Sequence, residues 1–478
     1  MTATQKPLAA AIAANRFGLG ASPGDLDAIQ GDPQGWLRKQ LKGLPPALTG
    51  DGLKPSAQTL SQAIDLRREL AEVRKEKKQG DEEAAKKAAL LKLPALYRPI
   101  YIDEIHARFT QAVTTDRPFL ERLTQFWTNH FAVSVDKNVV LGLAGAMERE
   151  AIRPNVLGNF ANLLVAVEKH PAMLLYLDNQ ASIGPNSRAG RFANGKGRKL
   201  DINENLAREI LELHTLGVDG GYTQADVTTF AKAITGWSIG GDAGESRRFA
   251  RLGGTDGRPG EFLFREIFHE PGAKKLLGRV YDEDGLRQGE AILKDLALRR
   301  ETARHVSTKL ARHFVADDPP PAVVNRLTTA WLDSRGHLPK VYEALLESPE
   351  AWEQPLAKFK TPTDYIYSTF RALDLPLIDK RRSLQSFEVL GQRSLQPGSP
   401  AGWPDTSSDW DGSSALLKRI AWADAVGQRL GSTRNARDLA PQLLGATLSD
   451  DTAKAIARAE SGSQALTLLL ASPEFMRR

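Results

Sequence analysis

The chain has 478 residues and no cysteine, and its 64 Lys and Arg residues against 58 Asp and Glu residues give a formal net charge of +6. The absence of cysteine excludes disulfide scaffolds, zinc–thiolate sites, iron–sulfur clusters and thiol nucleophiles. Hydrophobic residues make up 41% of the chain, enough to fill a large core, which excludes disorder of the whole chain.

The N-terminal residues carry one lysine and a short alanine-rich run that Asn15 and Arg16 interrupt. A secretory signal would need a basic start, a continuous apolar stretch and a small-residue cleavage site. No stretch reaches the ~18–20 apolar residues that a membrane span requires. We therefore expect no membrane span and a cytoplasmic location.

Helical periodicity dominates the rest of the chain. It predicts helices near residues 24–41, 58–92, 99–112, 117–132, 140–152, 155–168, 203–216, 223–235, 285–297, 301–315, 321–334, 338–347, 363–373, 383–391, 413–429, 438–444, 450–459 and 463–470. Thr223 and Asp226 form a capping box, and Ser472 precedes a proline as an N-cap. We expect a mainly α fold, one large domain of the orthogonal bundle type over residues 1–478, with a soft boundary between two lobes near 240–260.

Three features interrupt this pattern. Residues 67–92 carry charges of both signs and predict a solvated helical hairpin bent near Gly80. Residues 261–268 alternate in polarity and predict a small hairpin with residues 237–239. Glycine-rich or tryptophan-bearing loops are expected at 183–200, 239–260 and 396–414. The first two loops are basic. However, acidic residues are interleaved with basic residues in the chain, so we expect no nucleic-acid binding.

The most informative segment is the predicted helix 203–216. At 100° per residue, one stripe of this helix collects Asn205, Arg208, Glu209 and Glu212, while His214 lies on the opposite, apolar side. Such a stripe is what a polar substrate site needs, but solvated helix faces carry similar residues, and Arg208 and Glu212 are spaced as an ordinary ion pair. Both interpretations stay open.

Other candidate residues lie elsewhere in the chain. His130 falls on the apolar face of the predicted helix 117–132, where a buried imidazole needs partners for both nitrogens. His305, Lys309 and His313 share one helix face, which we interpret as a solvated basic face. Further polar or aromatic candidates for substrate binding are Asp178, Asn179, Asn203, His269 and Trp403. If buried, His130 and His214 would be able to share a polar pocket or a metal, but no HExxH spacing occurs, so we assign no metal ligands, and the sequence leaves the cofactor unknown.

Several segments give the chain a resemblance to a known bacterial family, the domain of unknown function 1800. They are residues 15–26, 122–134, 171–182, 203–227, 234–239, 268–278, 309–320, 359–373, 396–405 and 469–478. The resemblance implies a mainly helical bacterial protein, and it implies no particular activity. It also implies export in many members and a sulfatase-like protein partner. The chain departs from the family in lacking a visible export signal, and it has Glu270 where an aspartate is commoner after the histidine.

Two functions follow as alternatives. The first is an enzyme acting on a polar or anionic substrate, in particular a saccharide, at a site on helix 203–216. Its catalytic residues would be Glu209, Glu212, His214 and His130, and Trp403 would stack on a sugar ring. The second is a non-catalytic helical scaffold or partner-binding protein in which the polar stripe is a structural ion-pair network.

Overall fold

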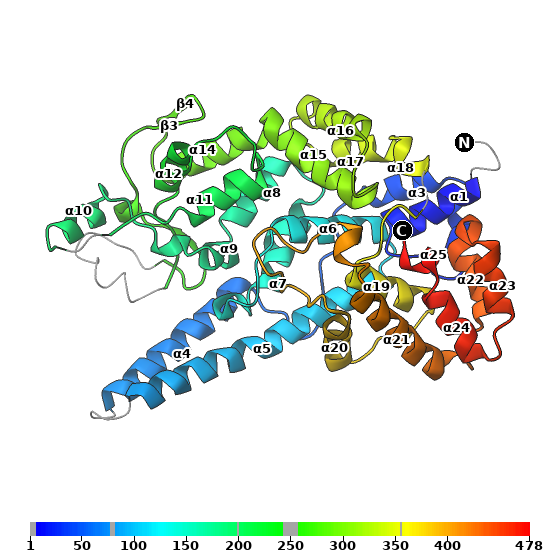
Figure 1. Ribbon diagram of the computed structural model, residues 1–478. Coiled ribbons are helices and arrows are strands. Elements are labelled where there is room, and N and C mark those ends of the chain that lie inside the picture. The colour runs from blue at the N-terminus through cyan, green and yellow to red at the C-terminus, as the bar shows by residue number, and fades with distance from the viewer. Residues whose placement is uncertain (1–5, 77–81, 198–199, 242–256, 354–355) are drawn as a thin grey trace.

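The structure is a computed structural model that describes residues 6–76, 82–197, 200–241, 257–353 and 356–478, with no side chains described between 70 and 92. It is mainly α-helical, as predicted, and elongated, with its short strands gathered at one end (Figure 1).

Residues 6–176 form the helices that surround the centre of the molecule. Their bounds are α1 (Lys6–Ile12), η1 (Ala13–Phe17), α2 (Asp25–Ile29), α3 (Pro33–Gln40), α4 (Ser56–Glu76), α5 (Glu82–Thr114), α6 (Pro118–His130), η2 (Asn138–Val140), α7 (Ala144–Met147), η3 (Glu148–Ile152), η4 (Arg153–Asn155), α8 (Phe160–Glu168) and α9 (Pro171–Tyr176). The pair α4 and α5 projects from the body as two long adjacent helices (Figure 1). The predicted bend at Gly80 lies outside the described residues.

The middle of the chain holds the strands. Its elements are η5 (Asn179–Ala181), α10 (Arg188–Asn194), α11 (Asn205–Glu209), η6 (Ile210–His214), α12 (Gln224–Ala233), β1 (Trp237–Ile239), β2 (Phe262–Phe264), η8 (Glu266–Phe268), β3 (Lys274–Leu276), β4 (Arg279–Tyr281) and α14 (Leu286–Ala297). The capping box of Thr223 and Asp226 opens α12 as predicted.

The remaining residues return to the centre. Their elements are α15 (Arg300–Phe314), α16 (Pro321–Asp333), α17 (Leu338–Leu346), α18 (Glu350–Glu353), α19 (Pro362–Ala372), α20 (Lys380–Leu390), η9 (Ser407–Asp409), α21 (Ser413–Leu430), α22 (Ala436–Leu444), η10 (Gly445–Thr447), α23 (Asp450–Ala457), α24 (Gly462–Leu470) and α25 (Pro473–Met476). Ser472 caps α25 as predicted.

The predicted hairpin is confirmed, and a second one was not foreseen. Strands β1 and β2 are antiparallel, with Trp237 opposite Phe264. Strands β3 and β4 are joined through Leu277 and Gly278, which both have positive φ angles, 48° and 83°. A two-residue turn of this hand matches strand twist, but it usually carries Asn-Gly or Asp-Gly, and Leu277 hid the signal.

The predicted loop 183–200 needs a correction. Residues Arg188–Asn194 form helix α10, whose N-cap Ser187 accepts a hydrogen bond from the Gly190 amide. The glycines and basic residues concealed this cap. Most of the other basic loop, at 242–256, lies outside the described residues.

One large buried cluster of apolar side chains extends from Ala10 to Met476. Within it, α6 reaches α8 and α15 through aromatic rings: Trp127 packs on Phe160, and Phe119 packs edge-on against Phe314. In the part of the chain that is described, no helix is both long and apolar enough to cross a membrane.

Candidate functional site

A cavity of about 370 Å³ lies next to this core, between helices α5, α6, α15 and α19 and the irregular segment 392–406. Most of its polar side chains come from segments far apart in the sequence. They are Arg108, Gln125, Thr128, Asn129, His130, Lys309, Arg312, His313, Thr361, Thr363, Asp364, Tyr367, Gln392, Arg393, Ser394, Asp405 and Thr406. This volume is within the range of pockets that bind small molecules.

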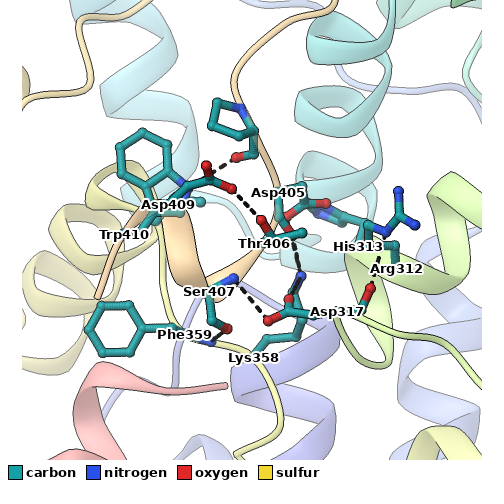
Figure 2. A network of polar contacts seen from close by, with 12 residues as sticks. Arg312, His313, Asp317, Lys358, Phe359, Asp405, Thr406, Ser407, Asp409 and Trp410 are labelled. Carbon is teal, nitrogen blue, oxygen red and sulfur yellow. Dashed lines mark hydrogen bonds and ion pairs between the residues drawn. The ribbon is translucent and has the colours of Figure 1, made fainter. Parts of the chain in front are cut away.

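His313 and Asp405 form the closest polar pair in the wall of the cavity (Figure 2). The His313 Nδ1 atom lies 2.7 Å from the Asp405 Oδ2 atom and donates to it. The Nε2 atom is buried and has no hydrogen-bond partner among the described residues. Burial lowers the pKa of His313, and the Asp405 carboxylate opposes that shift. A neutral imidazole held in this tautomer has its free lone pair on Nε2, the arrangement of a general base.

Two cationic side chains also contact Asp405. Lys358 Nζ lies 3.7 Å from its carboxylate and donates to its backbone carbonyl, and it also pairs with Asp317 at 2.5 Å (Figure 2). Arg478 adds a guanidinium nitrogen at 3.7 Å. Burial works against ionisation, but the hydrogen bond from His313 and the positive charges of Lys358 and Arg478 prevail and hold the pKa of Asp405 well below its usual range. The carboxylate therefore stays ionised beside His313.

His130 brings a second imidazole to the cavity. Its Nε2 atom lies 3.2 Å from the His214 carbonyl oxygen, which can only accept, so Nε2 carries the proton. The Nδ1 atom is buried and without a partner in the described structure. Burial, and next the charge of Lys309, depress the pKa of His130 well below its usual value. His130 is therefore neutral near pH 7.

Lys309 lies one helical turn before His313 and also lines the cavity. Burial lowers its pKa to about 8, against the opposing charge of Asp405. No hydrogen bond or ion pair to a described residue is found for its amine. By contrast, Arg312 donates to the Asp317 carbonyl, and Arg108 pairs with Glu148 at 2.8 Å. Lys309 is thus a cation that the protein leaves available in the cavity.

Behind Arg108, buried charges fix the helices that form the wall. Arg153 donates to Glu121 at 2.7 Å and to Glu148 at 2.8 Å, and all three side chains are nearly inaccessible. Glu148 opens the π-helix η3 and also accepts from Thr128. On the other side, Asp364 pairs with Arg122 at 2.9 Å. Such networks cost desolvation but fix geometry.

The predicted polar stripe lies outside this cavity. Asn205 is exposed, and Arg208, Glu209 and Glu212 are half-buried. Arg208 pairs with Glu204 at 3.1 Å, in place of the predicted pair with Glu212. The reason is local: after Glu209 the helix continues as the wider π-helix η6, so a projection at 100° per residue no longer applies. Burial raises the pKa of Glu209.

His214 is fully buried at the end of η6. Its Nδ1 atom donates to Glu168 at 2.8 Å, and its ring centroid lies 6.1 Å from that of His130. Both histidines are buried, in agreement with their predicted place on apolar helix faces. Of the two, only His130 lines the cavity. The catalytic roles of Glu209, Glu212 and His214 stay predictions.

Four predicted binding residues make structural contacts. Asn203 donates to the Leu177 carbonyl, and Asn179 donates to the carbonyls of Ile234 and Trp237. Asp178 pairs with Lys137 at 2.7 Å. His269 Nδ1 lies 3.1 Å from the Thr235 carbonyl oxygen. None of the four lines the 370 Å³ cavity, and a role for them in substrate binding stays a prediction.

Trp403 does line the cavity. The side-chain amide of Asn129 donates to its carbonyl oxygen at 2.9 Å and accepts from its backbone amide at 2.8 Å, which fixes the segment 392–406 to α6. Trp410 packs on Trp403 with ring centroids 5.9 Å apart. An aromatic wall of this kind suits a sugar ring or another flat apolar face.

The sequence interpretation missed three residues of this cavity, Lys309, His313 and Asp405. The prediction that His305, Lys309 and His313 form a solvated face is wrong, because all three side chains are half-buried. Two signals are present in the sequence. Three titratable residues share one helix face, and the segments 309–320 and 396–405 both contribute to the family resemblance.

A family model described as "Protein of unknown function (DUF1800)" matches residues 12–477, nearly the whole chain. The chain belongs to the DUF1800 family. In comparisons with curated proteins and with solved structures, nothing matches it. The cavity residues of this DUF1800 chain, from Arg108 to Thr406, all lie within the matched range.

Proposed function

We propose that this protein is an enzyme that binds a small polar, anionic substrate in the 370 Å³ cavity and uses His313 as a general base. The observation that carries the proposal is the 2.7 Å contact between His313 Nδ1 and Asp405, which leaves the Nε2 lone pair at the cavity wall without a partner among the residues that the structure describes. A carboxylate in this position orients an imidazole and stabilises the imidazolium that forms when it takes a proton.

The substrate class follows from the charges and the wall. Lys309 lines the cavity without an ion pair to a described residue, and Arg393 lines it with a distant pair to Glu388 at 3.9 Å. The carboxylates of the cavity, Asp364 and Asp405, are each within ion-pair distance of arginine or lysine. The excess of positive charge in the cavity favours the binding of an anionic substrate. Trp403 adds an aromatic surface, which favours a saccharide carrying a carboxylate, phosphate or sulfate group.

Nuclear magnetic resonance in D₂O tests the proposal on a panel of candidate substrates. The protein is incubated with a mixture of sugar acids, sugar phosphates and sugar sulfates, and both product formation and deuterium incorporation are followed. We expect at least one compound to change, and to change about 100-fold more slowly in His313→Asn. His106→Asn, which alters a histidine outside the cavity, is the matched control. No conversion of any compound, or equal rates in His313→Asn, contradicts the proposal.

A structural role for the polar stripe is the second candidate, and one observation favours it. Arg208 pairs with Glu204 at the start of α11 and donates to Gln224, and the second contact joins α11 to α12. Under this proposal the stripe positions η6, and η6 in turn positions His130 through the His214 carbonyl. A sulfatase-like partner stays a prediction.

A further inference from the structure

We infer that Lys309 is a nucleophilic amine that forms an imine with the carbonyl group of an anionic aldehyde or ketone bound in the cavity. The inference rests on the proposed function, because it names the substrate class of the same cavity. It goes beyond the proposed function because it assigns a covalent step to Lys309, whereas the proposed function assigns only proton transfer to His313.

The first argument is the position of Lys309. It belongs to α15 and lines the cavity together with the imidazoles of His130 and His313. The charge of Lys309 lowers the pKa of His130 and of His305, and the charge of Asp405 opposes the lowering of the pKa of Lys309, so these groups are electrostatic neighbours of the amine. Arg312 on the same helix is the other charged neighbour. A structural lysine would be expected to have a carboxylate in contact, and none of the described carboxylates forms an ion pair with Lys309.

The second argument is chemical. An amine attacks a carbonyl only when it is unprotonated, and partial burial beside other cations favours the neutral form. The pKa of about 8 for Lys309 is consistent with that environment. Lys360 also has a lowered pKa, but it donates to Ser368 in the core and does not line the 370 Å³ cavity, so it has no access to a substrate there.

The step balances without any further reagent. The Lys309 nitrogen lone pair forms a bond to the carbonyl carbon as the carbonyl π bond breaks, and one amine proton moves to the oxygen to give a carbinolamine. The carbon–oxygen bond then breaks, the second amine proton leaves with the oxygen as water, and a carbon–nitrogen double bond remains. The unshared lone pairs of His130 and His313 are the groups that can accept the proton released from the amine.

Reductive trapping tests the inference on the wild-type protein. The protein is treated with glyceraldehyde 3-phosphate and cyanoborohydride, and modified lysines are mapped by mass spectrometry. We expect Lys309 to be labelled about tenfold faster than the exposed Lys418 and Lys454, with a rate that rises through pH 8 and not near pH 10. Excess inorganic phosphate should slow the labelling. Labelling of Lys309 at the rate of the exposed lysines overturns the inference.

Two variants separate this inference from the proposed function. Lys309→Arg keeps the cation and should lose the label at this position, with thermal unfolding as the check on its fold. In His313→Asn, labelling of Lys309 should persist. If wild-type turnover depends on His313 but Lys309 is not labelled preferentially, only the imine is overturned. If Lys309 is labelled preferentially but no turnover depends on His313, only the proposed base is overturned.

Discussion

The side chains of His313 and Asp405 meet at 2.7 Å although 92 positions separate them in the chain. One belongs to the last turn of α15 and the other to an irregular segment that has no repeating hydrogen bonds of its own. The segment is held by Lys358, Arg478 and Asn129. The contact is therefore a product of packing between distant segments.

The Asp405→Asn variant should show how much this contact contributes to the pKa of His313 and to the free energy of unfolding. The variant removes the carboxylate that opposes the burial of His313, so the pKa of His313 should fall further. It also takes one anionic partner from Lys358 and one from Arg478, and the free energy of unfolding should fall by about 3 kcal/mol near neutral pH. Asp409→Asn, which changes an exposed residue of the neighbouring η9, is the control.

The pH dependence of that difference has a definite sign. The pKa of Asp405 is lower in the folded protein than its ordinary value of 3.8, so its stabilising contribution is present above that value and is lost as pH falls through the folded pKa. The gap between wild type and Asp405→Asn in urea unfolding should therefore shrink as the pH is lowered. A gap that stays constant down to acid pH would contradict the assignment.

Arg153→Met should be among the most damaging single changes in the protein. Methionine fills much of the volume but leaves Glu121 and Glu148 as buried carboxylates that have lost this partner, at a cost of about 4 kcal/mol. The matched control is Arg68→Met: its pair with Asp65 is exposed and should contribute less than about 0.5 kcal/mol. Chemical unfolding of both variants gives the comparison, and equal losses would rule out the buried network as the cause.

Glu209→Gln should stabilise the protein at neutral pH. Burial raises the pKa of Glu209, which means that the folded chain holds its proton more tightly than the unfolded chain does. Stability therefore falls as pH rises through the window between the ordinary value of 4.5 and the raised value, and the penalty is full above it. The variant should melt a few degrees higher near pH 7, by calorimetry, and the same as wild type near pH 4. A lower melting temperature at neutral pH would instead point to a stabilising role of the charge.

The Lys360→Met variant should reduce the dependence of the free energy of unfolding on pH above pH 7. Burial lowers the pKa of Lys360 from 10.5 to about 7, so between these values the unfolded chain binds the proton and the folded chain does not. Stability of the wild type should rise across this window, with a slope from this one group of up to about 1.4 kcal/mol per pH unit. The variant should lack that part of the slope in urea unfolding. Its partner Ser368 keeps a bond to the Tyr365 carbonyl. Parallel curves for the two proteins would contradict the shift.

Local chemistry made much of the fold predictable. The capping box at Thr223 and the pairing of the strand at Trp237 with that at Phe264 are decided by residues near one another in sequence, and both are as expected. The stripe on helix 203–216 was projected with a fixed 3.6-residue period, and the π-helix from Ile210 to His214 breaks that period without any residue type that announces it.

The cavity could not be derived in the same way. His130 and Trp403 were among the candidates, because an imidazole on an apolar face and tryptophans in a loop stand out. Lys309 and Asp405 did not, since a lysine on a helix and an aspartate in a polar loop are ordinary until their neighbours are known. Those neighbours are set by long-range packing, which periodicity does not encode.

The bracing of Asp405 by Arg478 has a consequence for the order of events during biosynthesis. Arg478 also exchanges backbone hydrogen bonds with Lys358 and donates to the His313 carbonyl. Arg478 can make these contacts only after it has left the ribosome, so during synthesis Asp405 depends first on His313 and Lys358. The last contact that braces Asp405 is therefore also the last to become available as the chain is made.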